Sequence, residues 1–262
     1  MSITSRFIGF WGVLKVLLVP LSSSRFLHGS FIVIILALDT TTRDGSIAVL
    51  HDGTIRVERT GDPSLTHGQR LPGELATALA ATGVRVEDID LLAVAAGPGS
   101  FTGLRVGIAT IQGIAMAHKK RVVAVSALEA LARAAVNADR TIGAWMDAQR
   151  HEVFAALYAA DGRDELISSV SAAPEGVLSA WSETTDLARV TFVGDGATRH
   201  EETLRRRIGP DVAIVAPPPL AGLIGQIAAE NPARAVLPHA IVPIYVRRSD
   251  AELARARRAA RP

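Results

Sequence analysis

Apolar positions along the first half of the chain switch between the period of a β-strand and that of an amphipathic helix. Three strand-like runs in residues 34–60 are separated by two Asp-Gly pairs, which favour tight hairpins because glycine accepts positive φ angles. A helix is predicted to begin at Thr66, because Gln69 follows at the spacing of a capping box. The pattern then predicts strand 91–95, helix 103–117, strand 122–125 and helix 127–136.

The second half repeats the same order of elements. The predicted elements are strands 141–147, 152–159 and 164–171, helix 175–181, strand 190–193, helix 198–208, strand 212–215 and helix 220–230. Two copies of one βββαβαβ unit indicate a duplicated α/β fold, in which each half is a mixed sheet with helices on both faces. We expect the boundary near residues 137–140, which gives an N-terminal domain over 33–138 and a C-terminal domain over 139–248.

The sharpest local signal is segment 97–103, Gly-Pro-Gly-Ser-Phe-Thr-Gly, which follows a strand and opens a helix. Such junctions often hold phosphates, because helix N-terminal N–H groups point outward and carry partial positive charge. The known motifs do not fit, since a Walker loop needs lysine where Leu104 stands and a dinucleotide fingerprint needs glycine at Thr102. A nucleophile elbow needs glycine at Pro98. The segment therefore resembles a ligand site but lacks its chemistry.

Four segments together resemble the TsaB (YeaZ) family. They are residues 36–42, the glycine loop 97–103 with the two residues after it, residues 146–154 and residues 243–247. The resemblance covers roughly residues 34–248, and the glycine loop is its most specific part. Gln149 departs from the pattern, since arginine is commoner there. The order of elements also resembles the ribonuclease-H-like fold of actin-like ATPases, where ATP lies between the two copies.

This resemblance implies a non-catalytic subunit of the complex that forms N6-threonylcarbamoyladenosine beside the anticodon of tRNAs that read ANN codons. In the family, TsaD transfers the threonylcarbamoyl group and TsaE supplies ATPase activity. We therefore expect TsaD and TsaE as partners, a homodimer when the chain is alone, and tRNA contact only through the complex. We expect no catalytic residue, no metal and no cofactor, while weak ATP or ADP binding stays open. The expected location is the cytoplasm, without membrane contact.

The partner interface is expected on two helices, because related proteins pair through the first two helices of the N-terminal domain. Gly103 and Gly107 lie one turn apart, and each glycine costs roughly 1 kcal/mol of helix propensity, which close helix packing usually offsets. The chain's own sheet is the alternative packing partner, and Arg70 and Arg105 are candidates for polar contacts at the rim. The predicted interface residues are Arg70, Leu71, Leu75, Leu79, Gly103, Leu104, Gly107 and Ile111.

A vestigial nucleotide cleft is expected where the two halves meet, since the first hairpin of each copy holds phosphates in the actin-like superfamily. The candidate residues are Asp39, Thr40 and Thr41 in the first half and Gly194, Asp195 and Gly196 in the second. In an active relative, an aspartate at position 39 would help to hold Mg²⁺ water. The alternatives are a side-chain turn at Asp39 and a turn at 194–196 that starts a helix.

Composition and charge restrict the function further. No two of the seven histidines stand four residues apart, so the helical metal dyad that TsaD carries is missing. The chain has no cysteine, which excludes disulfides and thiolate metal sites. Residues 1–32 and 247–262 hold nine of the 28 basic residues but only two of the 26 acidic ones. The remaining body is mildly acidic, so the charge count does not support direct binding of nucleic acid.

Two other functions compete with this interpretation. An autonomous ATP-dependent phosphotransferase of the same superfamily predicts nucleotide binding that is lost on Asp39→Ala, and a metallopeptidase requires a metal dyad. The ends of the chain lie outside the resemblance. For residues 1–32 we expect a translation start near Val33, with a disordered extension or a targeting segment as alternatives, because the apolar run is too short to span a membrane. Residues 249–262 are expected to form a basic tail.

Overall fold

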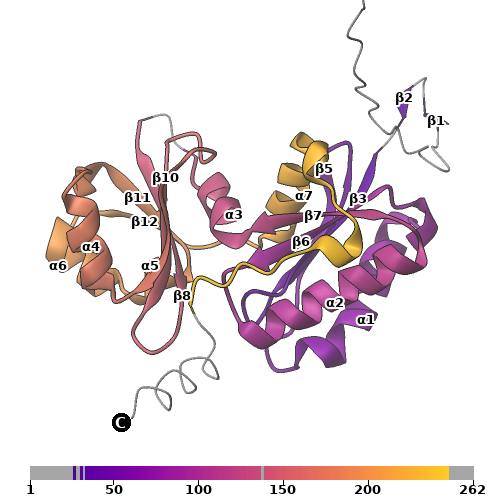
Figure 1. Ribbon diagram of the computed structural model, residues 1–262, viewed down its shortest axis with the longest axis horizontal. Coiled ribbons are helices and arrows are strands. Elements are labelled where there is room, and N and C mark those ends of the chain that lie inside the picture. Colours follow the sequence, from indigo (N-terminus) through magenta and orange to yellow (C-terminus); the bar gives the residue numbers. More distant parts are fainter. Residues whose placement is uncertain (1–25, 28–29, 32, 137–138, 248–262) are drawn as a thin grey trace, which may run out of the picture.

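The computed structural model describes residues 26–27, 30–31, 33–136 and 139–247, which form two halves side by side, each built on one five-stranded sheet (Figure 1). A short antiparallel pair, β1 (Phe26–Leu27) and β2 (Ser30–Phe31), precedes them. The first sheet contains β3 (Ile34–Asp39), β4 (Ser46–His51), β5 (Thr54–Thr60), β6 (Leu91–Gly97) and β7 (Arg121–Ser126). The second contains β8 (Thr141–Asp147), β9 (Val153–Tyr158), β10 (Glu165–Ala172), β11 (Val190–Val193) and β12 (Ala213–Val215).

Both sheets have one topology, which confirms the predicted duplicated α/β fold. The strand orders are β5-β4-β3-β6-β7 and β10-β9-β8-β11-β12, and in each the hairpin strands pair antiparallel while the last two strands pair parallel. Parallel neighbours need a crossover connection. In the first half, a helix at residues 101–117 joins the parallel strands β6 and β7. The loop between β6 and this helix lies at the end of the sheet nearest the second half (Figure 1).

Helices cover both faces of each sheet. Helices α1 (His67–Thr82) and α2 (Phe101–Ala117) lie on the outer face of the first sheet, and α3 (Ala127–Ala134) lies between the two sheets (Figure 1). The outer face of the second sheet carries α4 (Pro174–Ser182) and α6 (Glu201–Ile208), with the short α5 (Asp195–Arg199) beside β8. The predicted helix 198–208 is thus two helices that meet at His200. Short 3-10 turns are η1 (Val86–Asp88), η2 (Leu187–Arg189), η3 (Pro232–Arg234) and η4 (Pro238–Ala240).

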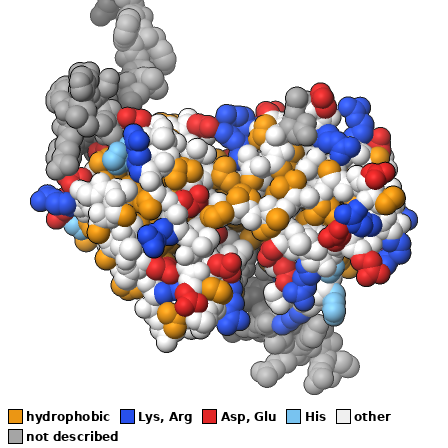
Figure 2. Space-filling model, turned by 180° about the vertical axis from the view of Figure 1, so that it is seen from behind, with side chains coloured by type: hydrophobic (Ala, Val, Ile, Leu, Met, Phe, Trp, Pro, Cys, Tyr) orange, Lys and Arg blue, Asp and Glu red, His pale blue; other side chains and the backbone are white. Residues whose placement is uncertain are grey.

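Alternation along β3 shows how one strand serves two cores. Leu36 and Leu38 pack with α1 and α2, whereas Ile35 and Ala37 point to the opposite face, where they join the core between the sheets. All four are fully buried, as expected for a strand with both faces covered. A third core lies in the second half around Trp145. Seen from behind (Figure 2), apolar side chains also gather on the surface where the two halves meet.

Helix α7 (Ala221–Glu230), the last α-helix of the described residues, packs on the first sheet although its sequence lies within 139–248, the range assigned to the second domain. Its first N–H groups are capped from that sheet: the Ser46 hydroxyl accepts from Ala221 at 2.9 Å and the Glu58 carboxylate from Gly222 at 2.6 Å. Ile224 and Ile227 fill the core between the sheets. The first half is therefore completed by residues from the end of the chain.

Candidate functional site

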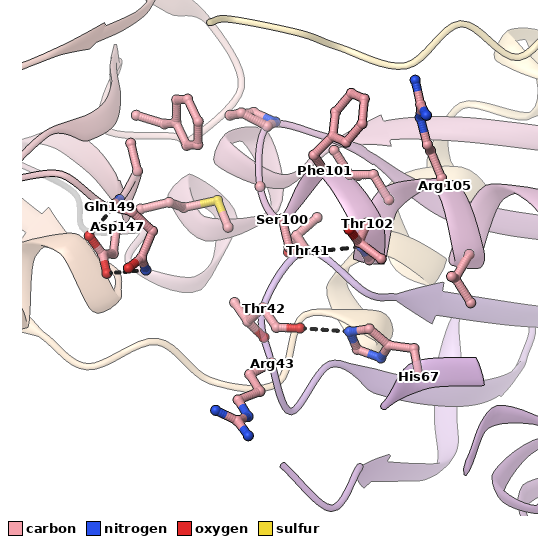
Figure 3. Close-up of a pocket in the computed structure, with 18 of the residues that line it drawn as sticks. Thr41, Thr42, Arg43, His67, Ser100, Phe101, Thr102, Arg105, Asp147 and Gln149 are labelled. Carbon is pink, nitrogen blue, oxygen red and sulfur yellow. Dashed lines mark hydrogen bonds between the residues drawn. The ribbon is translucent and has the colours of Figure 1, made fainter. Parts of the chain in front are cut away.

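A cavity of about 1220 Å³ lies between the two halves. The β3–β4 turn, the start of α1 and the glycine loop form its first-half wall, and the β8–β9 turn forms the second-half wall. Figure 3 shows Thr42 and Ser100 on one side and Asp147 and Gln149 on the other. Hydroxyl, guanidinium and aromatic side chains recur in the lining: Thr41, Thr42, Arg43, Ser64, Thr66, Ser100, Phe101, Thr102, Arg105, Tyr245 and Arg247.

Asp39 shapes the turn that faces this cavity. Its Oδ1 accepts hydrogen bonds from the Thr41 backbone N–H at 2.8 Å and from the Thr41 hydroxyl at 2.7 Å. Thr41 lines the cavity, whereas Asp39 and Thr40 are buried behind it. Burial raises the pKa of the Asp39 carboxyl, and the two hydrogen bonds from Thr41 act in the opposite direction. This is the geometry of a side-chain turn, the alternative considered above to a cation ligand.

The glycine loop lies against the same turn so closely that side chains would not fit. A Cβ atom on Gly103 would lie 2.1 Å from the Thr40 carbonyl oxygen, and one on Gly107 would lie 2.1 Å from the Thr40 hydroxyl. The Ser100 N–H donates to the Thr41 carbonyl at 2.8 Å, and the Gly103 N–H donates to the Ser100 hydroxyl at 3.2 Å. The N–H groups of Ser100 and Gly103 at the start of α2, which could have faced a phosphate, are thus used within the chain.

The residues predicted for a partner interface face the chain's own core, and that prediction is corrected here. Leu71, Leu75, Leu79 and Ile111 pack on the first sheet, because the apolar stripe of an amphipathic helix is the side that meets the sheet. The glycines lie against Thr40. An interface on these helices would have to use other residues. The buried residues are Arg70, Leu71, Leu75, Leu79, Gly103, Leu104, Gly107 and Ile111.

Arg70, expected at an interface rim, instead fastens α1 to the β3–β4 turn. It is 6% exposed, and its Nη1 donates to both carboxylate oxygens of Glu74 at 2.7 and 2.9 Å, while its Nη2 donates to the Asp44 carbonyl. His67 donates to the Thr42 carbonyl at 3.0 Å and accepts from Arg70 at 2.7 Å. Burial, and then the neighbouring Arg70 charge, lower the pKa of His67, which favours the neutral ring. The turn is therefore rigidly held.

The second-half candidates are likewise engaged by their own backbone. Oδ1 of Asp195 accepts from the Asp147 N–H at 3.1 Å and from the Gly196 N–H at 2.9 Å, and burial raises the pKa of this carboxyl. A Cβ on Gly194 would lie 2.0 Å from the Trp145 carbonyl oxygen, so this glycine lets α5 approach β8. Asp195 lines the cavity, but Gly194 and Gly196 do not. Of the predicted cleft residues, Thr41 and Asp195 thus line opposite walls.

Sequence reasoning missed the path of residues 236–247, here named the C-terminal strap. The strap pairs with β7 at Val236 and runs along α2 towards the second half, as the yellow trace in Figure 1 shows. The Ile244 N–H donates to the Ala96 carbonyl at 2.7 Å, and Arg247 donates to the Ala148 carbonyl at 2.8 Å. The strap therefore touches both halves at the cavity. Its irregular backbone leaves no periodic signal in the sequence.

The strap also completes an aromatic cluster at the mouth of the cavity. The Tyr245 and Phe101 rings lie 5.5 Å apart at 38°, and the Arg105 guanidinium lies 3.8 Å from the centroid of the Phe101 ring. Phe101 is 40% exposed and Tyr245 49% exposed. We name Phe101, Arg105 and Tyr245 the mouth cluster. Of these three residues, sequence reasoning singled out only Arg105, as a polar contact at an interface rim.

The outer faces of α1 and α2 carry small, mostly uncharged side chains. A Cβ added to Gly73 on α1 or to Gly113 on α2 would meet no atom within 4 Å, so both glycines face open space. Arg105 is the one exposed charged residue within the two helices. The exposed positions on these helices are Gly68, Gln69, Pro72, Gly73, Ala76, Thr77, Ala80 and Ala81 on α1 and Phe101, Thr102, Arg105, Ala109, Gly113, Met116 and Ala117 on α2.

Two further observations concern the residues that the structure describes. Among them, no group of three or more histidine, aspartate or glutamate side chains is placed to hold a metal ion. None of their helices is long and apolar enough to cross a lipid bilayer.

The repeated sheet topology, the intervening cavity and the glycine-rich turns define a protein with the two-subdomain fold of the actin-like ATPases. A family model described as "TsaD: tRNA N6-adenosine threonylcarbamoyltransferase" matches residues 62–254. The solved structure of YeaZ from Pseudomonas aeruginosa is 28% identical, with a TM-score of 0.66, and the match covers 81% of this chain and 99% of that one.

Two curated relatives, both named TsaB, also match the sequence of this chain. The tRNA threonylcarbamoyladenosine biosynthesis protein TsaB of Escherichia coli is 37% identical over 129 residues, which is 48% of this chain and 55% of the relative. The TsaB protein of Bacillus subtilis is 28% identical over 231 residues, 83% of this chain and 96% of the relative. The match thus spans about half of the first relative and nearly all of the second. The chain belongs to the TsaB (YeaZ) family.

Proposed function

We propose that this chain is a non-catalytic subunit in tRNA threonylcarbamoyladenosine biosynthesis that binds the TsaD transferase. The names of its relatives support the pathway. The observation that carries the non-catalytic role is the filling of the glycine loop by the chain itself: Thr40 and Thr41 lie where a ligand phosphate would have to approach Gly99 and Gly103. Its contribution would be to position TsaD, because orientation alone can supply a large part of a rate enhancement.

The outer faces of α1 and α2, apart from the mouth cluster at the start of α2, are the surface that best supports TsaD binding. Small residues such as Gly73, Ala76 and Gly113 let a partner helix approach closely, and few charges have to lose water there. The same surface would serve a homodimer when the chain is alone. TsaE and tRNA would then join the assembly built on this pair.

The cavity between the halves supports at most weak binding of ATP or ADP in this proposal. Its hydroxyl and arginine side chains could contact a nucleotide, but the backbone N–H groups of Ser100 and Gly103 at the start of α2 are already bonded within the chain. An autonomous phosphotransferase would need that cradle open. A metallopeptidase would need a cluster of metal ligands, and the described residues form no group of three or more.

A matched pair of variants tests the proposed surface. Gly73→Trp adds a large side chain to the outer face of α1, and Gly176→Trp makes the same change on α4, where a Cβ also meets nothing within 4 Å. Replacing a helical glycine does not reduce helix propensity, so both variants should fold. Thermal unfolding of each variant provides the control for folding.

We would co-purify each form with TsaD from the same organism and measure threonylcarbamoyl transfer to tRNA. The native chain and Gly176→Trp should form a stable complex and support transfer. Gly73→Trp should lose both the complex and the transfer. A complex that tolerates Gly73→Trp would move the interface elsewhere, and full transfer by TsaD without this chain would refute the subunit role.

A further inference from the structure

The mouth cluster has a composition that the fold does not require. Within residues 33–136 and 139–247, Phe101 and Tyr245 are the aromatic side chains that are widely exposed, while Trp145, Trp181 and Phe192 are at most 1% exposed. Exposed aromatic rings add little to stability, because burial is the source of their stabilisation. Their concentration in one exposed cluster is therefore a reason to look for a ligand.

Two arginines of the cavity wall, Arg105 and Arg43, have no acidic partner among the residues that the structure describes. Arg105 stacks on Phe101 and makes no ion pair within the described part of the chain. Arg43, exposed on the wall of the same cavity, donates to the Pro63 carbonyl at 2.6 Å and likewise has no acidic partner there. The exposed Thr102 also lines the cavity and adds a hydroxyl group. The site thus offers ring planes, two guanidinium groups and a hydroxyl.

We propose that the mouth cluster is a platform on which one unpaired nucleobase of an RNA stacks, with Arg43 and Arg105 facing its phosphates. Aromatic rings and guanidinium planes are the side chains on which unpaired bases stack in RNA-binding proteins. The choice of an RNA rests on the proposed function, because the pathway acts on tRNA. The rest of the RNA is held by the complex, since the mildly acidic body of this chain does not attract it.

The position of the cluster favours a base that arrives from outside. The inner end of the glycine loop is filled by Thr40 and Thr41, so a free nucleotide has no backbone cradle for its phosphates there. Phe101 and Tyr245 stand at the rim, about half exposed, where a base that has turned out of an RNA loop can reach them. A base on this platform would fix the orientation of the RNA on the TsaD complex.

Ultraviolet crosslinking tests the contact directly. We would irradiate the reconstituted TsaD complex with an anticodon stem-loop RNA and map the crosslinked peptides by mass spectrometry. The expected crosslinks lie at Phe101 or Tyr245, and the free chain with ATP serves as a parallel arm. Crosslinks to ATP but not to RNA would overturn the RNA proposal in favour of a free nucleotide, and crosslinks only elsewhere would overturn it outright.

Affinity of the same complex for the RNA gives an independent measure. Tyr245→Leu should weaken RNA binding by about tenfold, the loss expected for one stacked base. Arg105→Gln should weaken it and also reduce the slope of log K against log salt by about 1. Val242→Ala, exposed on the same strap, and Arg59→Gln, exposed on β5, are matched controls that should change nothing. Unchanged affinity in Tyr245→Leu and Arg105→Gln would refute the platform.

Failure of this inference can be told from failure of the proposed function. Tyr245 lies on the strap, outside the small-residue faces of α1 and α2, so Tyr245→Leu should leave the complex with TsaD intact. Loss of RNA affinity with an intact complex supports both proposals. Normal RNA affinity with an intact complex refutes the platform alone, and absence of any complex with the native chain refutes the proposed function.

Discussion

Gly103→Ala is the most direct test of how α2 lies against the β3–β4 turn. The added methyl group would stand 2.1 Å from the carbonyl oxygen of Thr40, far inside van der Waals contact. That oxygen belongs to the backbone of a fully buried residue, so it cannot rotate away as the end of a side chain can. Gly113→Ala makes the same change on the same helix, where nothing lies within 4 Å.

The two variants should move stability in opposite directions. Alanine in place of glycine within a helix favours folding by up to about 1 kcal/mol, and Gly113→Ala should show this gain. Gly103→Ala has the same favourable helix contribution, but overpacking of a rigid site lowers the free energy of unfolding by about 2–3 kcal/mol, towards the upper end of the usual range. The difference between the variants is therefore about 2–3 kcal/mol, since the helix term cancels.

Denaturant unfolding and thermal melts measure this difference. For a chain of this size, 1 kcal/mol shifts the melting temperature by roughly 2–4 °C, so the variants should melt about 4–12 °C apart. The far-ultraviolet circular dichroism of both should match the native chain, which keeps the comparison within one fold. Equal melting temperatures would mean that α2 does not approach Thr40, and that the start of the helix is free for a ligand.

Two further predictions concern buried polar groups. Asp39→Asn keeps the acceptor for Thr41 but removes a carboxyl whose pKa is raised by burial, so it should be more stable than the native chain at pH 7. This advantage in stability should fade as the pH falls through the raised pKa of Asp39 towards 3.8, because the folded native chain then binds a proton at Asp39 more readily than the unfolded chain does. Urea midpoints of both chains across this pH range test the prediction. A difference in midpoint that does not change with pH would contradict it. Ser46→Ala removes the hydroxyl that caps α7, so it should lower the free energy of unfolding by about 1–2 kcal/mol. The backbone amides of Leu220 and Ala221 should then exchange hydrogen faster, and unchanged exchange would show that the cap is not needed.

Strong local patterns carried the prediction of the fold. The Asp-Gly pairs fixed the hairpins, since Gly45 and Gly53 adopt φ angles of 58° and 73° that other residues resist. Gln69 accepts from the Thr66 backbone N–H at 3.0 Å, which begins α1 where the capping-box spacing placed it. The repeated order of strands then left few topologies, because parallel neighbours must be joined by a crossover.

The site was harder to predict, because an apolar stripe marks the side of a helix that is buried but not what buries it. Leu71, Leu75 and Leu79 form a clear stripe, and the chain's own sheet covers it. The informative positions were those between them, where Pro72, Gly73 and Ala76 lack charge although they are exposed. A helix face that is exposed but uncharged indicates a binding partner, and the spacing of the leucines gives no such indication.

Long-range placement left no local trace at all. The motif at 243–247 was recognised only as part of a resemblance, and nothing in its composition predicted that Tyr245 would meet Phe101 across 144 positions. The same holds for α7, whose apolar spacing predicted a helix but not which of two similar sheets it would cover. Such pairings depend on three-dimensional complementarity, here on Gly225 admitting Leu50.

The return of α7 to the first sheet determines when the protein can finish folding. Ile35, Ala37 and Leu50 are made early, yet the helix that covers them is synthesised only after the whole second sheet. Until then a freshly made first half exposes one apolar face of its sheet, a state prone to wrong contacts. A cut near residue 137 would therefore separate each sheet from a helix that covers it, α7 from the first sheet and α3 from the second.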